Sequence, residues 1–365
     1  MNSTNRTPSE SFLKSIPRWT IAAPAVASAI WVGTAFGLDG YFVILIASGL
    51  AGCVFAAVHH AEIVARRVGE PFGTLVLALA VTLIEVALIA SVMIAGGPGS
   101  AALARDTVFA AVMIILNGIV GLSLLLGGLR YREQVFSLEG AGAAQVALAT
   151  ITVMTLVFPN YTIAIPGPFY SPSQLGLVAI VSVVVYGAFI FTQTVAHRQF
   201  FLQDEPAAVA ALPGNTLAVA SALLLLLCLS IVVALAHNLA PHLEATVTRI
   251  GAPNAVVGVI IAGIVLLPEG LAALRAARHN RLQTSLNLAL GSALASIGLT
   301  IPVISILSLG MGTKLALGVD AESTVLLMLS LFVMTLVLRT GRTIILHAVV
   351  LLVIFAVYLF TTVVP

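Results

Sequence analysis

The sequence predicts an all-α polytopic membrane protein with about eleven transmembrane helices, arranged as one extra N-terminal helix and two inverted five-helix repeats. The first observation behind this prediction is composition, because 60% of the 365 residues are hydrophobic and only 8% are charged. Soluble domains carry about 25% charged residues. The mean hydropathy of +1.14 points the same way. The second and third observations are the length of the apolar runs and the distribution of Lys and Arg.

The apolar runs are long enough to cross a bilayer, whose hydrocarbon core requires about 20 residues of helix. The first run follows Arg6, Lys14 and Arg18, but it is too long for the apolar core of a signal peptide and lacks a convincing cleavage site. We therefore expect it to be retained as a helix. The expected spans are 19–37, 41–58, 73–95, 107–129, 142–159, 173–194, 216–240, 254–276, 284–309, 322–338 and 343–364.

Lys and Arg fall mostly in alternate loops, which gives the orientation through the positive-inside rule. With the N-terminus in the cytoplasm, thirteen of the sixteen basic residues lie inside and three lie outside. The inside set is Arg6, Lys14, Arg18, Arg66, Arg67, Arg130, Arg132, Arg198, Arg275, Arg278, Arg281, Arg339 and Arg342, and the outside set is Arg105, Arg249 and Lys314. We expect an integral protein of the plasma (bacterial inner) membrane, with the N-terminus cytoplasmic and the C-terminus outside.

The longest polar break divides the chain near its middle. We expect a tail and extra helix over 1–39, a first five-helix repeat over 40–196, a cytoplasmic linker over 197–215 and a second repeat over 216–365. A unit with an odd number of helices must lie upside down relative to its second copy. Inverted repeats are a common plan of transporters, which hold their substrate at the repeat interface near the bilayer midplane.

Two of the expected spans carry a glutamate near their middle, Glu85 in 73–95 and Glu269 in 254–276. A charge at the bilayer centre costs at least about 2.5–3.5 kcal/mol, so such residues are usually functional. Each glutamate lies on the second helix of its half. Inverted repeats would bring the two carboxylates together about a pseudo-two-fold axis. The alternative, a protonated and structural glutamate, is less favoured for both residues together than for either one alone.

Other oxygen atoms accompany the glutamates. Thr82 precedes Glu85 by three residues and shares its helix face. Proline lacks the N–H that would bond the carbonyl four residues earlier, so Pro268 frees the carbonyl of Ile264. Pro302 frees the carbonyl of Gly298 in the same way. The remaining candidate ligands are Asn117, Asn287 and Ser292, with Ser285 and Ser296 nearby.

These groups form an all-oxygen set, which suits hard cations such as Ca²⁺ with its six to eight oxygen ligands. No Cys or His occurs in these stretches, which disfavours a soft-metal site. The metal ligands are expected to be Glu85 and Glu269. Asn117, Ser292 and Ser296 are equally open to a second interpretation, as hydrogen-bonding contacts between helices.

A different class of function is suggested by His59, His60 and Glu62, which could hold a metal in an intramembrane enzyme. Such a site would need further ligands, and only His197 and His279 lie on the same side. A solvated helix end or a proton-sensing loop is the favoured interpretation of this cluster. A cation channel is a further alternative, disfavoured because the sequence has no pore loop.

Several segments resemble the two α-repeats of the cation/calcium exchanger superfamily and its bacterial Ca²⁺/H⁺ (also Na⁺/H⁺ and K⁺/H⁺) antiporter branch. They are the helix around Glu85, Asn117–Gly128, Pro268–Gly270, Asn287–Pro302, His60–Gly73 and Arg105–Thr107. The resemblance implies that Glu85 and Glu269 bind cation or proton, and that Asn117 and Ser292 contribute to the site. Many members carry Gly-Asn before each glutamate, whereas this chain has Val81-Thr82 and Val265-Leu266.

The expected function is secondary antiport of Ca²⁺, with Na⁺ or K⁺ as further ions, against H⁺ by alternating access. A carboxylate removed from water holds protons more tightly, whereas a bound cation favours its ionised form. The paired glutamates would therefore hold either protons or the cation. A monovalent Na⁺ or K⁺/H⁺ antiporter is the alternative. We expect no enzymatic activity, no cofactor and no nucleic-acid partner, while the oligomeric state is left open.

Overall fold

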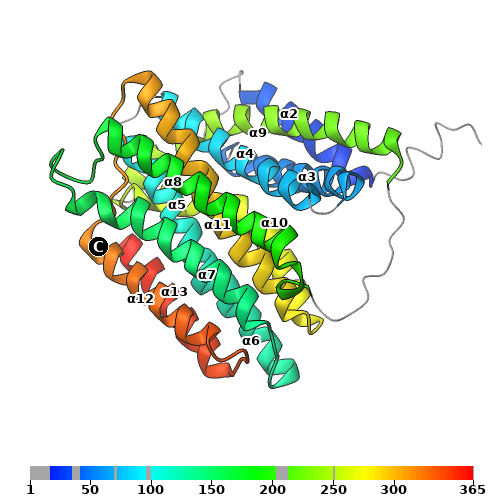
Figure 1. Ribbon diagram of the computed structural model, residues 1–365. Helices are drawn as coiled ribbons and strands as arrows, with labels where there is room; N and C mark the ends of the chain where they lie inside the picture. The colour runs from blue at the N-terminus through cyan, green and yellow to red at the C-terminus, as the bar shows by residue number, and fades with distance from the viewer. Residues whose placement is uncertain are drawn as a thin grey trace, which may run out of the picture. The chain divides into compact units, whose positions relative to one another are not determined.

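The computed structural model describes residues 17–34, 42–69, 72–95, 100–202, 213–249 and 251–364, and within these ranges the protein is built from helices (Figure 1). Two isolated β-bridges join loops, and no longer strand occurs in the described ranges. The prediction of an all-α membrane protein is confirmed. The helices are α2 (Arg18–Thr34), α3 (Phe42–Val68), α4 (Phe72–Ala95), α5 (Ser100–Met113), π-helix η1 (Ile114–Ile119), α6 (Val120–Tyr131), α7 (Leu138–Thr152), π-helix η2 (Val153–Val157), 3-10 helix η3 (Phe158–Tyr161), α8 (Pro172–Phe191), π-helix η4 (Thr192–Ala196), 3-10 helix η5 (Arg198–Phe200), α9 (Asn215–Arg249), α10 (Ala255–Arg278), α11 (Leu282–Met311), α12 (Ala321–Leu338) and α13 (Ile345–Val363).

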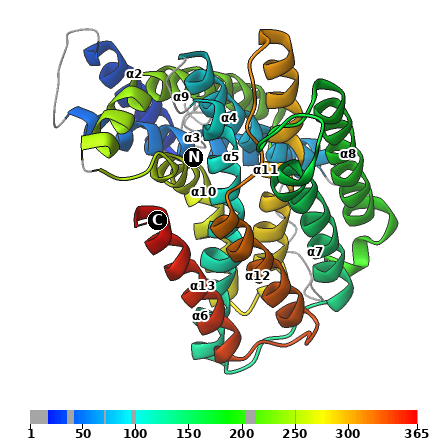
Figure 2. The same cartoon turned by 90° about the vertical axis from the view of Figure 1, so that its left-hand side faces the viewer.

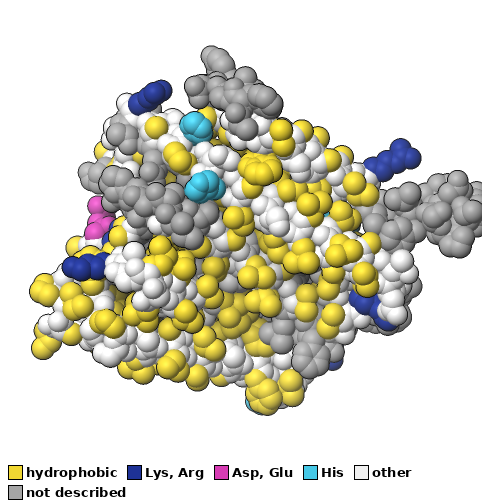
Figure 3. All heavy atoms as spheres, turned by 90° about the horizontal axis from the view of Figure 1, so that it is seen from above, with side chains coloured by type: hydrophobic (Ala, Val, Ile, Leu, Met, Phe, Trp, Pro, Cys, Tyr) yellow, Lys and Arg dark blue, Asp and Glu magenta, His cyan; other side chains and the backbone are white. Residues whose placement is uncertain are grey.

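Within the described residues, nine helical stretches are long and apolar enough to cross a membrane. They coincide with nine of the expected spans, and the other two expected spans, 19–37 and 73–95, coincide with α2 and α4. The total of eleven stays a prediction. The face drawn in Figure 3 is mostly apolar with few charged side chains, as a surface in contact with lipid requires.

The chain packs as two compact units whose boundaries differ from those of the predicted repeats. Unit 1 comprises residues 1–84 and 207–242, and unit 2 comprises 85–206 and 243–365. Unit 1 therefore contains α3 and most of α9, which are the first helices of the two predicted repeats. Unit 2 contains the later helices of both, except that α4 is divided between the two units after Ile84. The repeat boundaries themselves stay a prediction.

In unit 1, α2 packs along α3 (Figure 1). The approach is close at Gly49, where an added Cβ would lie 2.8 Å from Cδ1 of Ile30. Helices α3 and α9 are joined by Cys53, whose Sγ donates to the carbonyl oxygen of Cys228 at 3.5 Å. Both thiols are buried and free. Small side chains at such contacts are typical of helices that associate in lipid.

In unit 2, helix α11 packs against α7, α8 and α10. Helix α12 lies beside α7 and α13, and α13 lies along α6 (Figures 1 and 2). Helices α5 and α10 approach closely at Gly258, where an added Cβ would lie 2.9 Å from the carbonyl carbon of Asp106. Helix α11 therefore has neighbours on several sides, and most of its side chains are buried.

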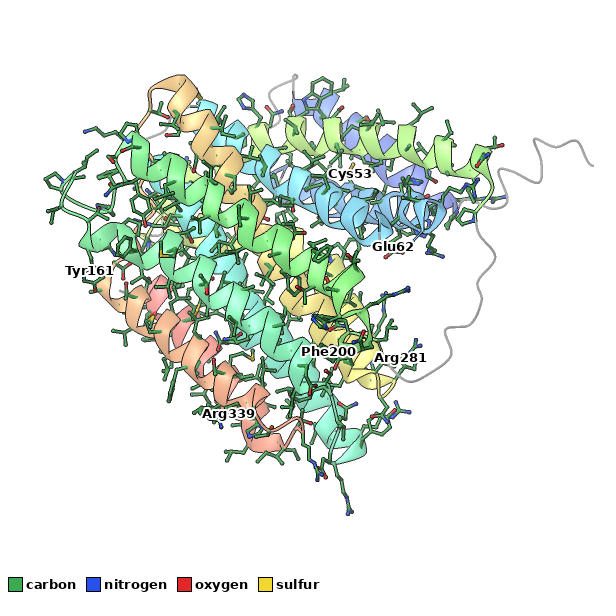
Figure 4. All side chains as sticks on the ribbon, viewed as in Figure 1. Cys53, Glu62, Tyr161, Phe200, Arg281 and Arg339 are labelled. Carbon is green, nitrogen blue, oxygen red and sulfur yellow. The ribbon has the colours of Figure 1, made fainter. Side chains whose placement is uncertain are left out.

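The loops of unit 2 gather at two ends. At one end, Phe136 N donates to the carbonyl of Gly341 (3.1 Å), and Thr343 N donates to that of Gln134 (3.1 Å). The Gln134 side chain donates to the carbonyl of Ala277 at 3.2 Å. This joins the loops after α6, α10 and α12, and the end includes Arg281 and Arg339 (Figure 4).

The second end of unit 2 joins the other set of loops. Ala316 N donates to the carbonyl of Ala101 at 3.1 Å, and Val319 N donates to that of Leu156 at 2.8 Å. The side chain of Arg105 donates to the carbonyl of Gly318 at 3.0 Å. The alternate loops predicted to share a side of the membrane thus lie together in the fold. Which end faces the cytoplasm stays a prediction.

Candidate cation site

Helix α11 holds both membrane glutamates through hydroxyl groups on consecutive turns. Ser296 Oγ donates to Oε1 of Glu85 at 2.6 Å. Ser292 Oγ donates to Oε2 of Glu269. The two serines are four residues apart, so they share one helix face and are separated by about 6 Å along the axis. Glu85 comes from α4 and Glu269 from α10. Three helices therefore bring the two carboxylates to one place.

The two carboxylates differ in exposure and interact with each other. Glu85 is buried, with 4% of its surface exposed, whereas Glu269 keeps part of its surface exposed. They lie close enough for electrostatic interaction. Two like charges inside a protein repel each other more strongly than they do in water, because the effective dielectric constant is lower there. Each also loses hydration inside the membrane, so the pair favours bound protons or a bound cation over two free charges.

Two further polar side chains border the site and were not identified from the sequence. Thr300 lies one turn beyond Ser296, is fully buried and has an Oγ1 without a hydrogen-bond partner among the described residues, although it lies near Glu85. Tyr186 of α8 is buried and lies close enough to Glu269 for electrostatic interaction. Thr300 could have been identified from the sequence, because Ser292, Ser296 and Thr300 follow one another in steps of four and so share a helix face.

The two expected proline positions lie inside helices, Pro268 in α10 and Pro302 in α11. The carbonyls of Ile264 and Gly298 consequently lack the usual helical donor. Gly298 also has a packing role, because an added Cβ there would lie 2.9 Å from the Cβ of Tyr186. Absence of a side chain at this position allows α8 to approach α11 beside the carboxylates.

Two expected ligands make other hydrogen bonds. Asn117 Nδ2 donates to Ser330 Oγ of α12 at 2.9 Å. Asn287 Nδ2 donates to the carbonyl of Phe201 at 2.6 Å, and its Oδ1 accepts from Gln283 at 2.9 Å. Asn287 thus joins the start of α11 to the segment after η5, near the labelled Phe200 in Figure 4.

Thr82 is buried on α4, three residues before Glu85. Its role as a ligand, like those of Asn117 and Asn287, stays a prediction. The prediction is least supported for Asn287, since both polar atoms of its side chain are already engaged.

The histidine cluster lies inside α3, more than two turns before the helix ends at Val68, and His60 is fully buried, so the interpretation as a solvated helix end is wrong for His60. His60 Nε2 lies 3.4 Å from the carbonyl oxygen of Thr20, and the ring of His59 packs 5.6 Å from that of Trp19. Glu62 pairs with Arg66 at 3.4 Å (Glu62 is labelled in Figure 4). No group of three or more His, Cys, Asp or Glu suited to a metal ion occurs in the described part of the chain.

The two additional histidines considered for a metal site also have local contacts. The ring of His197 stacks on that of Phe200, with centroids 5.1 Å apart. His279 Nδ1 lies 2.7 Å from the carbonyl oxygen of Arg275. Neither contact indicates metal binding.

A helical membrane fold with two carboxylates inside its apolar helices is typical of an ion transporter. The family model described as sodium/calcium exchanger protein matches residues 40–195 and 220–364. The chain belongs to this family, so it is an exchanger and not an enzyme. Membership excludes the intramembrane enzyme and the channel as alternatives. It also confirms the resemblance to the cation/calcium exchanger superfamily.

Several known proteins are similar over most of this chain. A Sinorhizobium fredii protein, y4hA, named as an ionic transporter, is 48% identical over 358 residues, 96% of this chain and 97% of its own length. The sodium-potassium/proton antiporter ChaA of Escherichia coli is 36% identical over 319 residues, 86% of each chain. The crystal structure of the Ca²⁺/H⁺ antiporter YfkE superposes with a TM-score of 0.73 at 17% identity, over 96% of this chain and 100% of that one. This last likeness shows the fold.

Proposed function

We propose that the protein is a secondary cation/proton antiporter in which Glu85 and Glu269 hold either protons or the transported cation, with Ca²⁺ as the main ion. The observation that carries this proposal is the pair of hydrogen bonds from Ser292 and Ser296 of α11 to the two carboxylates. A single helix thereby brings two titratable groups into one site. Alternating access would expose that site to each side of the membrane in turn.

The exchange of protons for a cation follows from the chemistry of these groups. When both glutamates are protonated, the site is neutral and stable in a low-dielectric environment. A cation displaces the protons because the ionised carboxylates attract it. Each serine hydroxyl donates its one proton to a carboxylate and keeps lone pairs, with which its oxygen can also bind the ion. Protons and cation thus compete for the same oxygen atoms.

The preference for Ca²⁺ rests on charge. Two carboxylates are neutralised by one divalent ion, and exchange for two protons would then be electroneutral. Further oxygen ligands would come from Asn117, Thr82 and the free carbonyls of Ile264 and Gly298. The Ca²⁺/H⁺ exchange of a protein with the same fold, YfkE, is consistent with this choice. A third proton would make exchange electrogenic, at about 2.3 kcal/mol per 100 mV.

The second candidate is exchange of Na⁺ or K⁺ for H⁺, with one carboxylate remaining protonated. It is supported by the sodium-potassium/proton antiporter of Escherichia coli, which is 36% identical to this chain. Val81-Thr82 and Val265-Leu266 also stand where many exchangers supply Gly-Asn. Fewer amide oxygens would suit an ion that needs fewer ligands. We propose the plasma (bacterial inner) membrane as the site of action in either case.

The test is proton movement in liposomes that contain the purified protein and a trapped pH indicator. Ca²⁺, Na⁺ and K⁺ are added separately, and Ca²⁺ is then added at two pH values with excess Na⁺ or K⁺. We expect Ca²⁺ to drive proton movement, with an apparent affinity that rises with pH because fewer protons compete. Proton movement that follows a monovalent ion and ignores Ca²⁺ would establish the second candidate.

Glu85→Gln and Glu269→Gln serve to test the site itself. Each removes a charge needed for the exchange, yet a neutral amide is tolerated in the bilayer better than a carboxylate, so both variants should insert and fold. We expect both to lose cation-driven proton movement. Glu139→Gln, the same change at an exposed position at the start of α7, is the matched control. Near-normal exchange by either site variant would overturn the two-carboxylate site.

A further inference from the structure

Asn117 has a hydrogen-bonded amide nitrogen and an unpaired oxygen. It lies in η1 and is fully buried. Nδ2 donates to Ser330 Oγ at 2.9 Å and more weakly to the carbonyl of Met113 at 3.4 Å. Oδ1 is buried and has no hydrogen-bond partner within the described ranges. A buried polar group left unpaired costs about 1–3 kcal/mol, so its presence here calls for a functional explanation.

The orientation of this amide is determined by Ser330. The Ser330 hydroxyl is fully buried and has one proton, which it donates to the carbonyl of Leu326 in its own helix at 2.8 Å. The sulfur of Met113, at 3.6 Å, is its other possible acceptor. With its proton used in either way, the hydroxyl can only accept from Asn117. The NH₂ group of Asn117 therefore faces Ser330, and the carbonyl of Met113 at 3.4 Å, which can only accept, favours the same orientation.

Asn117 lies beside the helices that form the cation site. Both α10 and α11 contact η1. Two residues after Asn117, Ile119 packs against the residue that follows Glu269, because an added Cβ on Gly270 would lie 3.1 Å from Cδ1 of Ile119. Single-turn π-helical segments such as η1 are frequent at functional sites. The segment that carries Asn117 thus packs against both α10 and α11, the helices that carry Glu269 and the two serines.

We propose that Ser330 is a positioning residue for cation binding. It accepts a hydrogen bond from Asn117, fixes the amide orientation and so leaves Oδ1 of Asn117 free to act as a neutral oxygen ligand of the transported ion. This proposal rests on the proposed function. It assigns a role to α12, a helix in which the sequence indicated no site residue.

A double-mutant cycle tests this proposal in the liposome assay, using whichever of Ca²⁺, Na⁺ and K⁺ drives proton movement in the unmodified protein. Ser330→Ala should raise the apparent KM for that ion about 3- to 10-fold, the range expected for loss of one hydrogen bond. The maximal rate should change less than the KM. Asn117→Ala should raise the KM by at least as much. Ser330→Ala should then add nothing in the Asn117→Ala background, because it acts only through that residue.

Two further variants separate positioning from packing. Ser330→Thr keeps the hydroxyl and should restore much of the affinity. Thr335→Val removes another hydroxyl of α12 that accepts from a glutamine on a neighbouring helix, Gln145 Nε2, at 3.4 Å. Its KM should stay near that of the unmodified protein. If Asn117→Ala does not fold, the positioning role is tested by comparing the KM of Ser330→Ala with those of Ser330→Thr and Thr335→Val.

An unchanged KM in Ser330→Ala, or an effect of equal size with and without Asn117, would overturn the positioning role. So would a KM in Thr335→Val that rises as much as in Ser330→Ala. These outcomes are distinct from failure of the proposed function, which would appear as exchange that persists in Glu85→Gln or Glu269→Gln.

Discussion

Ser292 and Ser296 have the same chemistry but bond to different carboxylates. A hydroxyl that donates to a carboxylate stabilises its ionised form. Under the proposed function, the hydroxyl would therefore help each glutamate to release its proton when the cation binds. Two uncharged side chains on α11 would then influence the proposed competition between ion and proton.

We expect Ser292→Ala and Ser296→Ala each to move the pH dependence of cation affinity to higher pH. Without the hydroxyl, the proton is held more tightly and a lower proton concentration is needed to release it. Hydrogen bonds to charged groups contribute about 1.5–3 kcal/mol, which corresponds to about one to two pH units. The measurement is apparent cation affinity across a pH series in liposomes.

The control for these variants is Ser305→Ala, on the same helix. Ser305 is buried, and its Oγ donates to the carbonyl of Ile301 within α11 at 2.6 Å. Its pH profile should match that of the unmodified protein. Equal shifts in all three variants would mean that the serines affect α11 as a whole and not the carboxylates.

At the residue scale, the sequence located the glutamates because a charge in an apolar run is conspicuous. Ser292 followed from the resemblance to exchangers, and the steps of four to Ser296 and Thr300 were readable on a helical face. Ser330 could not be identified in this way, because it lies 213 residues from Asn117 and only the folded structure brings them together. The hydrogen bonds of Asn287 to Phe201 and Gln283 could not be predicted either, because its neighbours in three dimensions were unknown, and its role as a ligand stays a prediction.

Helix α11 is the element that connects the site to the surrounding bundle. One of its faces carries the serines, and Gly298 contacts α8 through Tyr186. A glycine in a helix interior normally costs about 0.5–1 kcal/mol relative to alanine. At Gly298 the close approach of Tyr186 outweighs that cost.

Gly298→Ala should therefore destabilise the protein by about 1–3 kcal/mol, the usual cost of overpacking. The new Cβ would lie 2.9 Å from the Cβ and 3.1 Å from the Cγ of Tyr186, so α8 would have to shift. Exchange should also weaken, because Tyr186 lies near Glu269. Thermal unfolding in detergent measures the first effect, and the liposome assay measures the second.

The same substitution at Gly310 of α11 provides the comparison. An added Cβ there has no atom of the described chain within 4 Å, beyond its own helix backbone and neighbours. We expect no loss of thermal stability in Gly310→Ala. A melting temperature of Gly298→Ala equal to that of the unmodified protein would show that α8 can adjust without cost.

At the element scale, hydrophobic runs predicted where the helices lie. The π-helical and 3-10 segments within or beside them could not be predicted in this way. The expected span 107–129 is a helical stretch over 101–131 with η1 in its middle. A π-helical turn arises from one locally extra residue, and apolar periodicity over so short a segment does not reveal it. The region around 197–200 was expected in the linker, yet it forms η5.

For the whole molecule, the sorting of loops at the two ends of unit 2 agrees with the alternation of basic residues in the sequence. The two segments matched by the exchanger family, 40–195 and 220–364, lie within the two predicted repeats, and the division itself stays a prediction. The compact units could not be predicted from sequence, because they combine helices from both halves of the chain. Hydropathy reports which segments enter the membrane and not which of them pack together.

Orientation is tested by cysteine labelling with a membrane-impermeant reagent in intact cells, after Cys53 and Cys228 have been replaced by serine. Lys314→Cys and Val364→Cys should be labelled from outside, whereas Arg278→Cys should be labelled only after the membrane is opened. Labelling of Arg278→Cys in intact cells would show that the orientation is opposite to the predicted one. Protection of Val364→Cys would mean an even number of spans.

The location of both serines on one helix has a consequence for ion size. The backbone hydrogen bonds of α11 fix the distance between consecutive turns, so the Cα atoms of the two serines cannot approach each other around a smaller ion without breaking the helix. The glutamates approach from other helices through flexible side chains, and any adjustment to ionic radius falls to their rotamers. The proposed site thus combines a fixed spacing between two serines with two flexible glutamate side chains. If the proposed site binds the ion, its selectivity for ion size would depend on the side chains of α4 and α10, which adjust to a spacing set by α11.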